Sequence, residues 1–488
     1  MIRHFGIVST FLAALFLFSP LAVNAQAPPA GPGSSTNYGE QSLSSSAPAS
    51  GQSSFSGSVP SKPIPGVLPL SLPEAIDRGL KQNLGLLLAN EDIRSARGSR
   101  WQQLSSLLPN VTTSSYINVS QVNLQEFGFN FNIPNVNIPS VVGPFSYFDA
   151  RPYLTQSLFD WKAIQKTRAA TETLKSTQYS YKDARDVVVL AVGYNYLLTI
   201  ANAARIETAD AQVKTAQALY DQASDQVKAG TSPAIDALRA QVELQTRQQQ
   251  LIQAKNDFAI QKLNLSRVIG LAPGQEFELT DRSPYQQLES ISVEEALKRA
   301  YASRSDFQAL LADVRSAEHS RKAAEAGYYP SLSLSADYGV AGQHPSESHG
   351  VFDVRGTLTI PIFQGGKVHG DILQADAQLE QSRQRVENLR GQIDADVRTA
   401  LLNLQSASEL VTVAQSNIGL AEQTLLQSRD RFIAGVTDTV EVVQAEETVA
   451  SANEQLISSL YSYNYAKIFL ARALGLAEQG VREYFKGK

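Results

Sequence analysis

The amino-acid sequence predicts a mixed fold, in which membrane β-strands form a barrel and long α-helices form a coiled-coil barrel that continues it. Three observations predict this fold: an internal duplication, segments with alternating apolar and polar residues, and long stretches without proline. Alternation with a period of two indicates strands, whereas an apolar repeat every seven residues indicates coiled-coil helices. The duplication places these elements in two tandem structural repeats.

The duplication is visible as the same short motifs at corresponding places in the two halves of the chain. Glu74–Arg78 matches Glu295–Arg299, and Ala229-Gly230 matches Ala434-Gly435. Chance agreement at many such landmarks is improbable, so the chain is interpreted as two copies of one unit. The first repeat, the inter-repeat linker, the second repeat and the C-terminal tail are assigned to residues 67–271, 272–292, 293–476 and 477–488.

The alternating segments predict two strands in each repeat. Leu332, Leu334 and Ala336 alternate with Ser333 and Ser335, so one face is apolar and the other polar. This pattern, over about ten residues, is typical of a tilted strand in a membrane barrel, although an amphipathic sheet of a soluble protein is the alternative. Strands are predicted at about 111–122, 145–159, 331–340 and 351–362, of which the second is interrupted by Pro152.

The stretches without proline predict very long helices. Ile372, Leu379, Val386, Ile393 and Ala400 form a seam with a spacing of seven residues, and Leu174, Tyr181 and Val188 repeat it in the first copy. Long helices are predicted at 162–229, 233–270, 367–434 and 437–474, with shorter helices at 84–108 and 305–329 before the strands. A shorter helix and the helix after the turn together match the long helix in length, so the two can stack along it.

Four strands in one chain cannot close a membrane barrel, because the smallest closed membrane barrels have eight strands. Open strand edges in lipid would leave backbone N–H and C=O groups unpaired, which costs several kcal/mol for each group. The strands are therefore expected to be shared among chains. Two chains would supply eight strands and three would supply twelve, and counting alone does not choose between them.

Composition and the N-terminal segment agree with an exported protein. The chain has 488 residues, a net charge of -5 and no cysteine, which disfavours nucleic acid as a partner and excludes disulfides, thiolate metal sites and a lipid anchor on cysteine. Residues 1–25 are predicted to be a signal peptide, with an uncleaved anchor as the alternative. Residues 26–66 are rich in Pro, Ser and Gly and are predicted to be a disordered leader.

The sequence resembles the TolC-like outer-membrane efflux channel family over roughly residues 70–476. The resemblance is carried by the duplication, the Leu72–Ala75 and Val293–Ala296 openings, Pro109 and Pro330 before the first strands, and the Ala-Gly turns. It implies a homotrimer with a twelve-stranded barrel in the outer membrane and a twelve-helix tube in the periplasm. It also implies contact with outer-membrane lipid, a periplasmic adaptor (membrane fusion) protein, and an inner-membrane pump or secretion transporter.

The resemblance also implies where the functional residues lie. The turns between long helices would form the closed periplasmic entrance, with Gly230, Thr231, Gly435 and Val436 at the tips that dock the adaptor. The pore constriction would contain the acidic and amide side chains that follow the turns, namely Asp236, Asp438, Glu441 and Gln444. Thr437 takes the place of an arginine that can latch the gate. The alternative interpretation is that these acids only stabilise helix N-termini.

No catalytic constellation, cofactor site or metal site is predicted. The histidines have no partner at metal-ligand spacing, and Gly365-Gly366-Lys367 lacks the upstream glycine of a phosphate-binding loop. The predicted function is a passive exit duct for small molecules in a tripartite efflux system. The alternatives are a type I protein-secretion duct and a periplasmic coiled-coil adaptor or structural protein; an exported enzyme is disfavoured. The sequence does not identify the substrate, the pump or the adaptor.

Overall fold

A computed structural model describes residues 57–128, 139–281, 285–288 and 291–484 of the chain. The chain divides into the units Met1–Gly51 and Gln52–Lys488, and all described residues belong to the second unit. The predicted signal peptide and residues 26–56 of the predicted leader lie outside the described residues.

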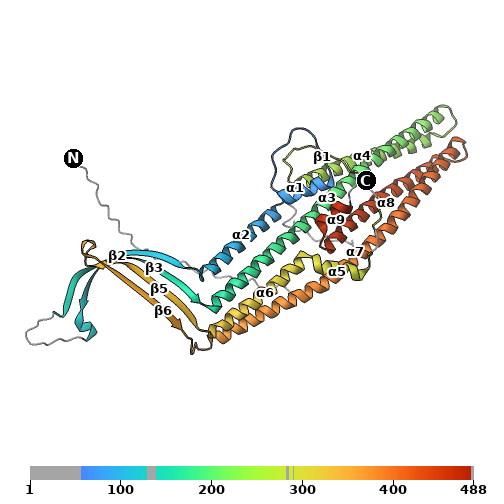
Figure 1. The fold of residues 1–488 in the computed structure, drawn as a ribbon. Coiled ribbons are helices and arrows are strands. Elements are labelled where there is room, and N and C mark those ends of the chain that lie inside the picture. Colours follow the sequence, from blue (N-terminus) through green and yellow to red (C-terminus); the bar gives the residue numbers. More distant parts are fainter. Residues whose placement is uncertain (1–56, 129–138, 282–284, 289–290, 485–488) are drawn as a thin grey trace, which may run out of the picture. The chain divides into compact units, whose positions relative to one another are not determined.

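The same order of helices and strands occurs in the two halves of the chain (Figure 1). The first half contains α1 (Leu72–Gln82), α2 (Leu84–Ser105), β2 (Asn110–Asn123), β3 (Val141–Phe159), α3 (Trp161–Lys228) and α4 (Ala234–Ile269). The second half contains α5 (Val293–Ser303), α6 (Ser305–Glu325), β5 (Ser331–Gly342), β6 (His349–Thr359), α7 (Lys367–Ile433) and α8 (Thr439–Ala473). The smaller elements are β1 (Leu68–Leu70), β4 (Phe277–Leu279), α9 (Ala477–Tyr484) and the 3-10 turns Leu124–Phe127, Ala326–Tyr328 and Pro345–Glu347.

The long helices α3 and α7 each pack against two shorter helices. α3 packs on α2 and α4, and α7 packs on α6 and α8 (Figure 1). In α7 the seven-residue repeat was predicted up to Ala400. The residues at this spacing are buried from Leu379 onward, and the buried repeat continues as far as Ser428. In α3 the small residues Ala209, Ala216 and Ala223 keep the same spacing. Small side chains in these seams let neighbouring helices approach closely along their length.

A four-stranded antiparallel sheet joins the two halves in the order β2-β3-β5-β6. Alternate residues of each strand lie on opposite faces, so the register assigns every side chain to one of two faces. The apolar face contains Val111, Leu154, Leu334 and Val354, and the opposite face is mostly Ser, Thr, Tyr and charged residues. β2 and β6 are the edges of the sheet.

Two predicted strand features were wrong. β3 was predicted to be interrupted at Pro152, but it runs through this residue. Pro152 is opposite Thr113 of β2. On the other side of β3, Arg151 and Pro152 have no partner in the hydrogen-bonded ladder to β5. This arrangement is possible because proline, which has no N–H group, lies where the ladder to β5 is open. β6 ends at Thr359 rather than at 362, just before a segment that contains Pro361.

The predicted leader, which was expected to be disordered, and the predicted linker and C-terminal tail all contain residues with defined contacts. In the predicted leader, the N–H groups of Val59 and Ser61 donate to the carbonyls of Gln82 (2.8 Å) and Gly270 (2.8 Å). In the predicted linker, β4 pairs in parallel with β1. In the predicted C-terminal tail, α9 packs on α8 and contributes Ala477 to the largest core cluster.

That largest core cluster lies where α1, α3, α4, α8 and α9 meet. It includes Val188, Val192 and Tyr196 of α3, and Ile468 of α8. The Tyr196 hydroxyl donates a hydrogen bond to the carbonyl of Leu70 at 2.9 Å. Among the helices that the structure describes, α3 is apolar enough over 18 residues to cross a membrane by composition, with a mean hydropathy of 1.6. Half of that window is buried, as expected for a helix in a protein core.

Candidate functional site at the turns between long helices

Both turns between long helices contain a glycine in the left-handed conformation. Gly230 and Gly435 have φ angles of 75° and 70°, in the left-handed region that glycine adopts at low cost. The next residue closes each turn: Thr231 N–H donates to the Gln226 carbonyl (3.0 Å), and Val436 N–H donates to the Arg431 carbonyl (2.9 Å). Each chain reversal is therefore compact.

Substitution of Gly435 is expected to weaken the second turn. Gly435→Ala would force a residue with a Cβ atom into the left-handed region, at a cost of ~1–2 kcal/mol. Gly419→Ala is a matched control, because Gly419 lies inside α7 with open space around its Cα, where alanine favours the helix by ~1 kcal/mol. Thermal unfolding followed by circular dichroism should give a lower midpoint for Gly435→Ala and a raised one for Gly419→Ala. Equal midpoints would contradict the turn assignment.

The predicted constriction residues of the second turn differ in exposure and in partners. Glu441 is half-buried and pairs with Arg431 of α7 at 3.1 Å, and it also accepts a hydrogen bond from the Thr437 hydroxyl. Asp438 is exposed and caps α8 by accepting from the N–H of Val440 at 3.2 Å. Gln444 is exposed one turn further along α8.

These contacts change two expectations. α8 begins at Thr439 rather than at 437, because Asp438 is the residue that caps it. Thr437, which was expected to stand where the resembled family can have a latching arginine, donates its hydroxyl to the carboxylate of Glu441 within its own turn.

Asp236 of the first turn is buried, in contrast to the exposed Asp438. It accepts a hydrogen bond from the Ser232 hydroxyl at 2.7 Å and lies 3.6 Å from the guanidinium of Arg239. The structure thus places Asp236 and Glu441 at equivalent positions after their turns, each next to a hydroxyl and an arginine.

The tips of the two hairpins are held together by a small apolar cluster. It contains Ala223, Ala240, Phe432 and Val442, which come from all four long helices. On the outer side of the second turn, Ile433 and Val436 leave 64% and 68% of their surfaces exposed. The second turn therefore carries two exposed apolar side chains next to its glycine.

A group of charges between the two hairpins was not predicted from the sequence. The inner charge cluster consists of Glu243, Arg247 and Glu446, which are buried, and Arg429, which is half-buried. Arg247 donates to Glu243 at 2.6 Å, and Arg429 donates to Glu446 at 3.1 Å. Burial raises the pKa of Glu446, and Arg429 partly opposes this shift.

The inner charge cluster borders a cavity of about 450 Å³ between the hairpins. The signal in the sequence was the acid Glu446 in the same helical stripe as Val442 and Val449, where the neighbouring positions are apolar. Charges in such a stripe make the contact between the two hairpins polar at this level.

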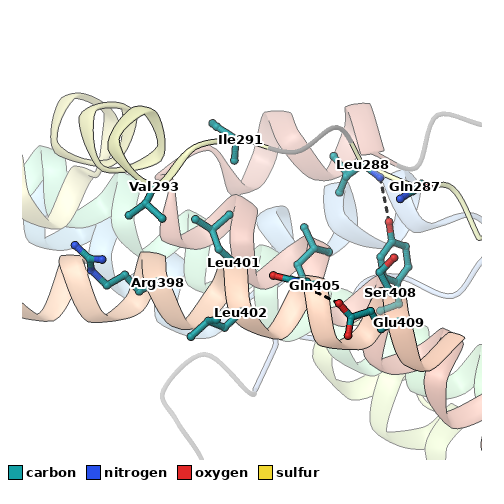
Figure 2. Close-up of a pocket in the computed structure, with 12 residues that line it drawn as sticks. Gln287, Leu288, Ile291, Val293, Arg398, Leu401, Leu402, Gln405, Ser408 and Glu409 are labelled. Carbon is teal, nitrogen blue, oxygen red and sulfur yellow. Dashed lines mark hydrogen bonds between the residues drawn. The ribbon is translucent and has the colours of Figure 1, made fainter. Parts of the chain in front are cut away.

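A second cavity, of about 590 Å³, lies between α7 and the residues Gln287, Leu288, Ile291 and Val293. Figure 2 shows Leu401 and Leu402 on α7, with Arg398 and Glu409 at opposite ends of the lining. The Tyr463 hydroxyl accepts a hydrogen bond from the N–H of Leu288 at 3.1 Å and so holds the inter-repeat segment to α8. The lining is mostly apolar, and in the part of the chain that the structure describes no three acidic or histidine side chains gather in a way that could hold a metal ion.

A sequence profile of the family described as "Outer membrane efflux protein" matches residues 75–271 and 296–476. Among curated proteins, the chain is similar to the outer membrane protein TolC of Escherichia coli K12, with 22% identity over 346 residues, 66% of this chain and 68% of TolC. It is similar to the alkaline protease secretion protein AprF of Pseudomonas aeruginosa, with 22% identity over 325 residues, 64% of this chain and 66% of AprF. It is also similar to the cation efflux system protein CusC of Escherichia coli K12, with 26% identity over 174 residues, 33% of this chain and 38% of CusC.

The fold is similar to those of solved outer-membrane channels. The Campylobacter jejuni outer membrane channel CmeC matches with a TM-score of 0.71 and 18% identity, over 83% of this chain and 86% of CmeC. The Vibrio cholerae outer membrane protein VceC matches with a TM-score of 0.71 and 18% identity, over 83% of this chain and 96% of VceC. Both halves of the chain thus have the arrangement of strands and helices found in such channels.

Proposed function

Because the chain belongs to the outer membrane efflux protein family, we propose that three copies of it form a passive exit duct for small molecules. The protein is an outer-membrane efflux channel, and the family consists of channels rather than enzymes. In the proposed assembly the sheets of three chains close one barrel of twelve strands in the outer membrane. The helices of the three chains form a tube in the periplasm, which receives solutes from an inner-membrane pump through a periplasmic adaptor.

One observation carries this proposal: the four-stranded sheet has an exposed apolar face and two open edges. On β6, Phe352, Val354 and Leu358 are more than half exposed, and Ile117 and Val119 are equally open on β2. In water such a face would be an aggregation hazard, whereas in a bilayer it is the surface that contacts lipid. Lipid cannot satisfy the backbone groups of β2 and β6, so these edges require strands of neighbouring chains.

The helices also carry apolar stripes that remain exposed among the residues that the structure describes. On α4, Leu238, Val242 and Leu263 are exposed, and on α7, Val413 and Leu420 are exposed. Val413 and Leu420 are seven residues apart, so they lie above one another on one side of α7. This side differs from the buried seam that faces α8. Such a second seam supports a ring in which every helix has a neighbour on either side.

Charges in the α7 stripe are expected to prevent trimer assembly without unfolding the chain. Val413→Asp combined with Leu420→Asp would desolvate two carboxylates at the contact between chains, and we expect the trimer band on native gels to be lost. Gln415→Asp is the control, because Gln415 is exposed on another side of α7. A stable trimer of the double variant would remove this stripe from the interface.

The helix tips are the proposed periplasmic entrance. Asp236, Asp438, Glu441 and Gln444 follow the two turns, and in a trimer each would occur three times around the axis. Rings of carboxylates in a narrow pore favour cations. The exposed residues of the turns, Gly230, Thr231, Gly435 and Val436, are the proposed contact with the adaptor.

The second candidate function is a duct for type I protein secretion, favoured by the similarity to AprF, which is named as an alkaline protease secretion protein. Deletion of the gene separates the two functions. We expect increased susceptibility to small toxic compounds and an unchanged set of secreted proteins. Loss of a secreted protein with unchanged susceptibility would support the second candidate. Release of the protein from outer membranes by carbonate would contradict both candidates and support a periplasmic adaptor.

A further inference from the structure

The four-stranded sheet carries five acidic and basic residues, and all of them lie on its polar face. They are Asp149 and Arg151 of β3, Asp337 of β5, and Asp353 and Arg355 of β6. The register places them close together. Asp337 of β5 is opposite Asp353 of β6. The neighbouring pair on the same face is Ser335 of β5 and Arg355 of β6. We call these five residues the charged belt. Above and below it the same face contains mostly Ser, Thr and Tyr.

The inner part of the charged belt is a network fixed by several contacts. Arg151 Nε donates to Asp149 at 3.0 Å, Arg151 Nη1 donates to Asp337 at 3.0 Å, and the Tyr147 hydroxyl donates to Asp149 at 2.8 Å. The side chain of Asp149 is only 1% exposed. The network therefore links β3 of the first half to β5 of the second half.

The backbone beside Arg151 is shaped to receive this side chain. A Cβ atom on Gly339 would lie 2.7 Å from Cγ of Arg151 and 2.2 Å from the carbonyl oxygen of Ala150. Only glycine leaves enough room at this position for the arginine to cross from β3 to β5. Arg151 is thus placed by the strands themselves, and only 20% of its side chain is exposed.

The outer part of the charged belt is accessible. Arg355 donates to Asp353 at 2.9 Å on the edge strand, and their side chains are 69% and 51% exposed. Three carboxylates and two guanidiniums give a formal excess of one negative charge in each chain. The fixed inner network and the accessible outer pair lie on the face opposite the one proposed to contact lipid.

We propose that the charged belt selects solutes by charge inside the barrel, favouring cationic over anionic solutes at a point separate from the periplasmic entrance. The proposal rests on the duct function above, because only a closed barrel turns the polar face of the sheet into a lumen. In a trimer the belt repeats three times around that lumen with an excess of three negative charges. Charges lining a water-filled passage attract counter-ions and repel like-charged ions, and the effect weakens with added salt.

The absence of cysteine from the chain allows a test at one introduced thiol. Ser333→Cys places a thiol on the polar face near the belt, opposite Thr357, and Leu358→Cys places one on the apolar face. The trimer is reconstituted in vesicles of uncharged lipid. The rates of modification by a cationic and by an anionic methanethiosulfonate reagent are then measured for each thiol. The ratio of the cationic to the anionic rate reports the local electrostatic potential. Neither reagent has to pass through the proposed periplasmic entrance to reach the thiol.

The expected result is faster modification of Ser333→Cys by the cationic reagent. The measurement is made in ~0.01 M salt, where the Debye length is ~30 Å. Arg355→Gln removes a positive charge and should raise the ratio of cationic to anionic rates at this thiol by roughly threefold or more. Asp353→Asn removes a negative charge and should lower the ratio by a similar factor. In ~1 M salt the differences should vanish. Both residues are exposed, so these variants keep the fold. Arg398→Gln, which removes an arginine paired with Asp394 on α7, should leave the ratio unchanged.

Two outcomes separate failure of the belt from failure of the duct. A reactive Ser333→Cys thiol whose ratio does not respond to Arg355→Gln or Asp353→Asn would overturn the charge selection and leave the duct intact. An unreactive Ser333→Cys thiol beside a reactive Leu358→Cys thiol would overturn the assignment of faces, and with it the proposed barrel.

Discussion

Val354→Arg is expected to destabilise the proposed barrel by ~2–4 kcal/mol, the cost of an arginine on the lipid side of a membrane strand near the middle of the bilayer. Val354 lies in the middle of β6 on the apolar face, and 63% of its surface is exposed in the single chain. Folding into lipid vesicles, titrated with urea and followed by heat-resistant migration on gels, measures this loss.

The matched control is Thr357→Arg, three residues further along the same strand. Thr357 lies on the polar face opposite Ser333, so an arginine there would point into water, and we expect a loss below ~1 kcal/mol. An equal loss for the two variants would mean that the two faces of β6 have the same surroundings, which is incompatible with a membrane strand.

Asp186→Asn is expected to stabilise the chain at pH 8 by up to ~3 kcal/mol and to have little effect at pH 4. Asp186 lies in α3, is 7% exposed and accepts a hydrogen bond from the backbone N–H of Glu478. Burial raises its pKa from 3.8 to about 6, while Arg472 opposes the shift and Asp183 and Glu478 add repulsion. This difference in pKa corresponds to ~3 kcal/mol.

The sign of the pH dependence follows from which state binds the proton more tightly. Between pH 3.8 and about 6 the folded chain holds the proton of Asp186 better than the unfolded chain does, so this residue makes stability fall as the pH rises through that range. Asparagine keeps the hydrogen-bond acceptor and removes the charge. Thermal unfolding at the two pH values measures the difference.

The control for Asp186→Asn is Asp394→Asn on the exposed side of α7. Arg398 lowers the pKa of Asp394, so its charged form is favoured in the folded state. Its replacement should therefore give no gain at pH 8. A destabilised Asp186→Asn at pH 8 would show that the carboxylate is needed for its charge, against the expectation from burial.

The long helices and their turns were readable in the sequence because each has a strong local cause. The seven-residue repeat through Leu379, Val386 and Ile393 requires a coiled-coil partner, and glycine at 230 and 435 supplies a conformation that other residues resist. These signals depend on neighbours in the sequence. They therefore placed the ends of α3 and α7 within one residue of the observed ends.

The features that were missed depend on partners far away in the chain. β1 forms by pairing in parallel with β4, which lies in the predicted linker about 200 residues later. The segment at Val59 and Ser61 is ordered only because Gln82 and Gly270 offer carbonyl groups to it. A composition rich in Pro, Ser and Gly gives no sign of such pairing.

The candidate site was likewise predictable in position but not in its contacts. The spacing of Asp236 and Glu441 from their glycines placed both acids in the first turns of α4 and α8, where the structure has them. That Asp236 is buried beside Ser232, and that Glu441 pairs with Arg431 of the preceding helix, depends on how each hairpin closes. Sequence spacing within one helix does not report that geometry.

α3 and α7 have nearly equal lengths, 68 and 67 residues. This match limits how the helices of such a protein can become longer or shorter. An insertion of one heptad in α7 alone would move its turn by about 10 Å past that of α3. It would also separate Phe432 and Val442 from Ala223 and Ala240, which hold the tips together. Insertions and deletions in the long helices are therefore expected only as whole heptads made in both hairpins and in their partner helices at once. A point mutation can adjust the pore of such a protein, whereas its length can evolve only by coordinated, multi-site events.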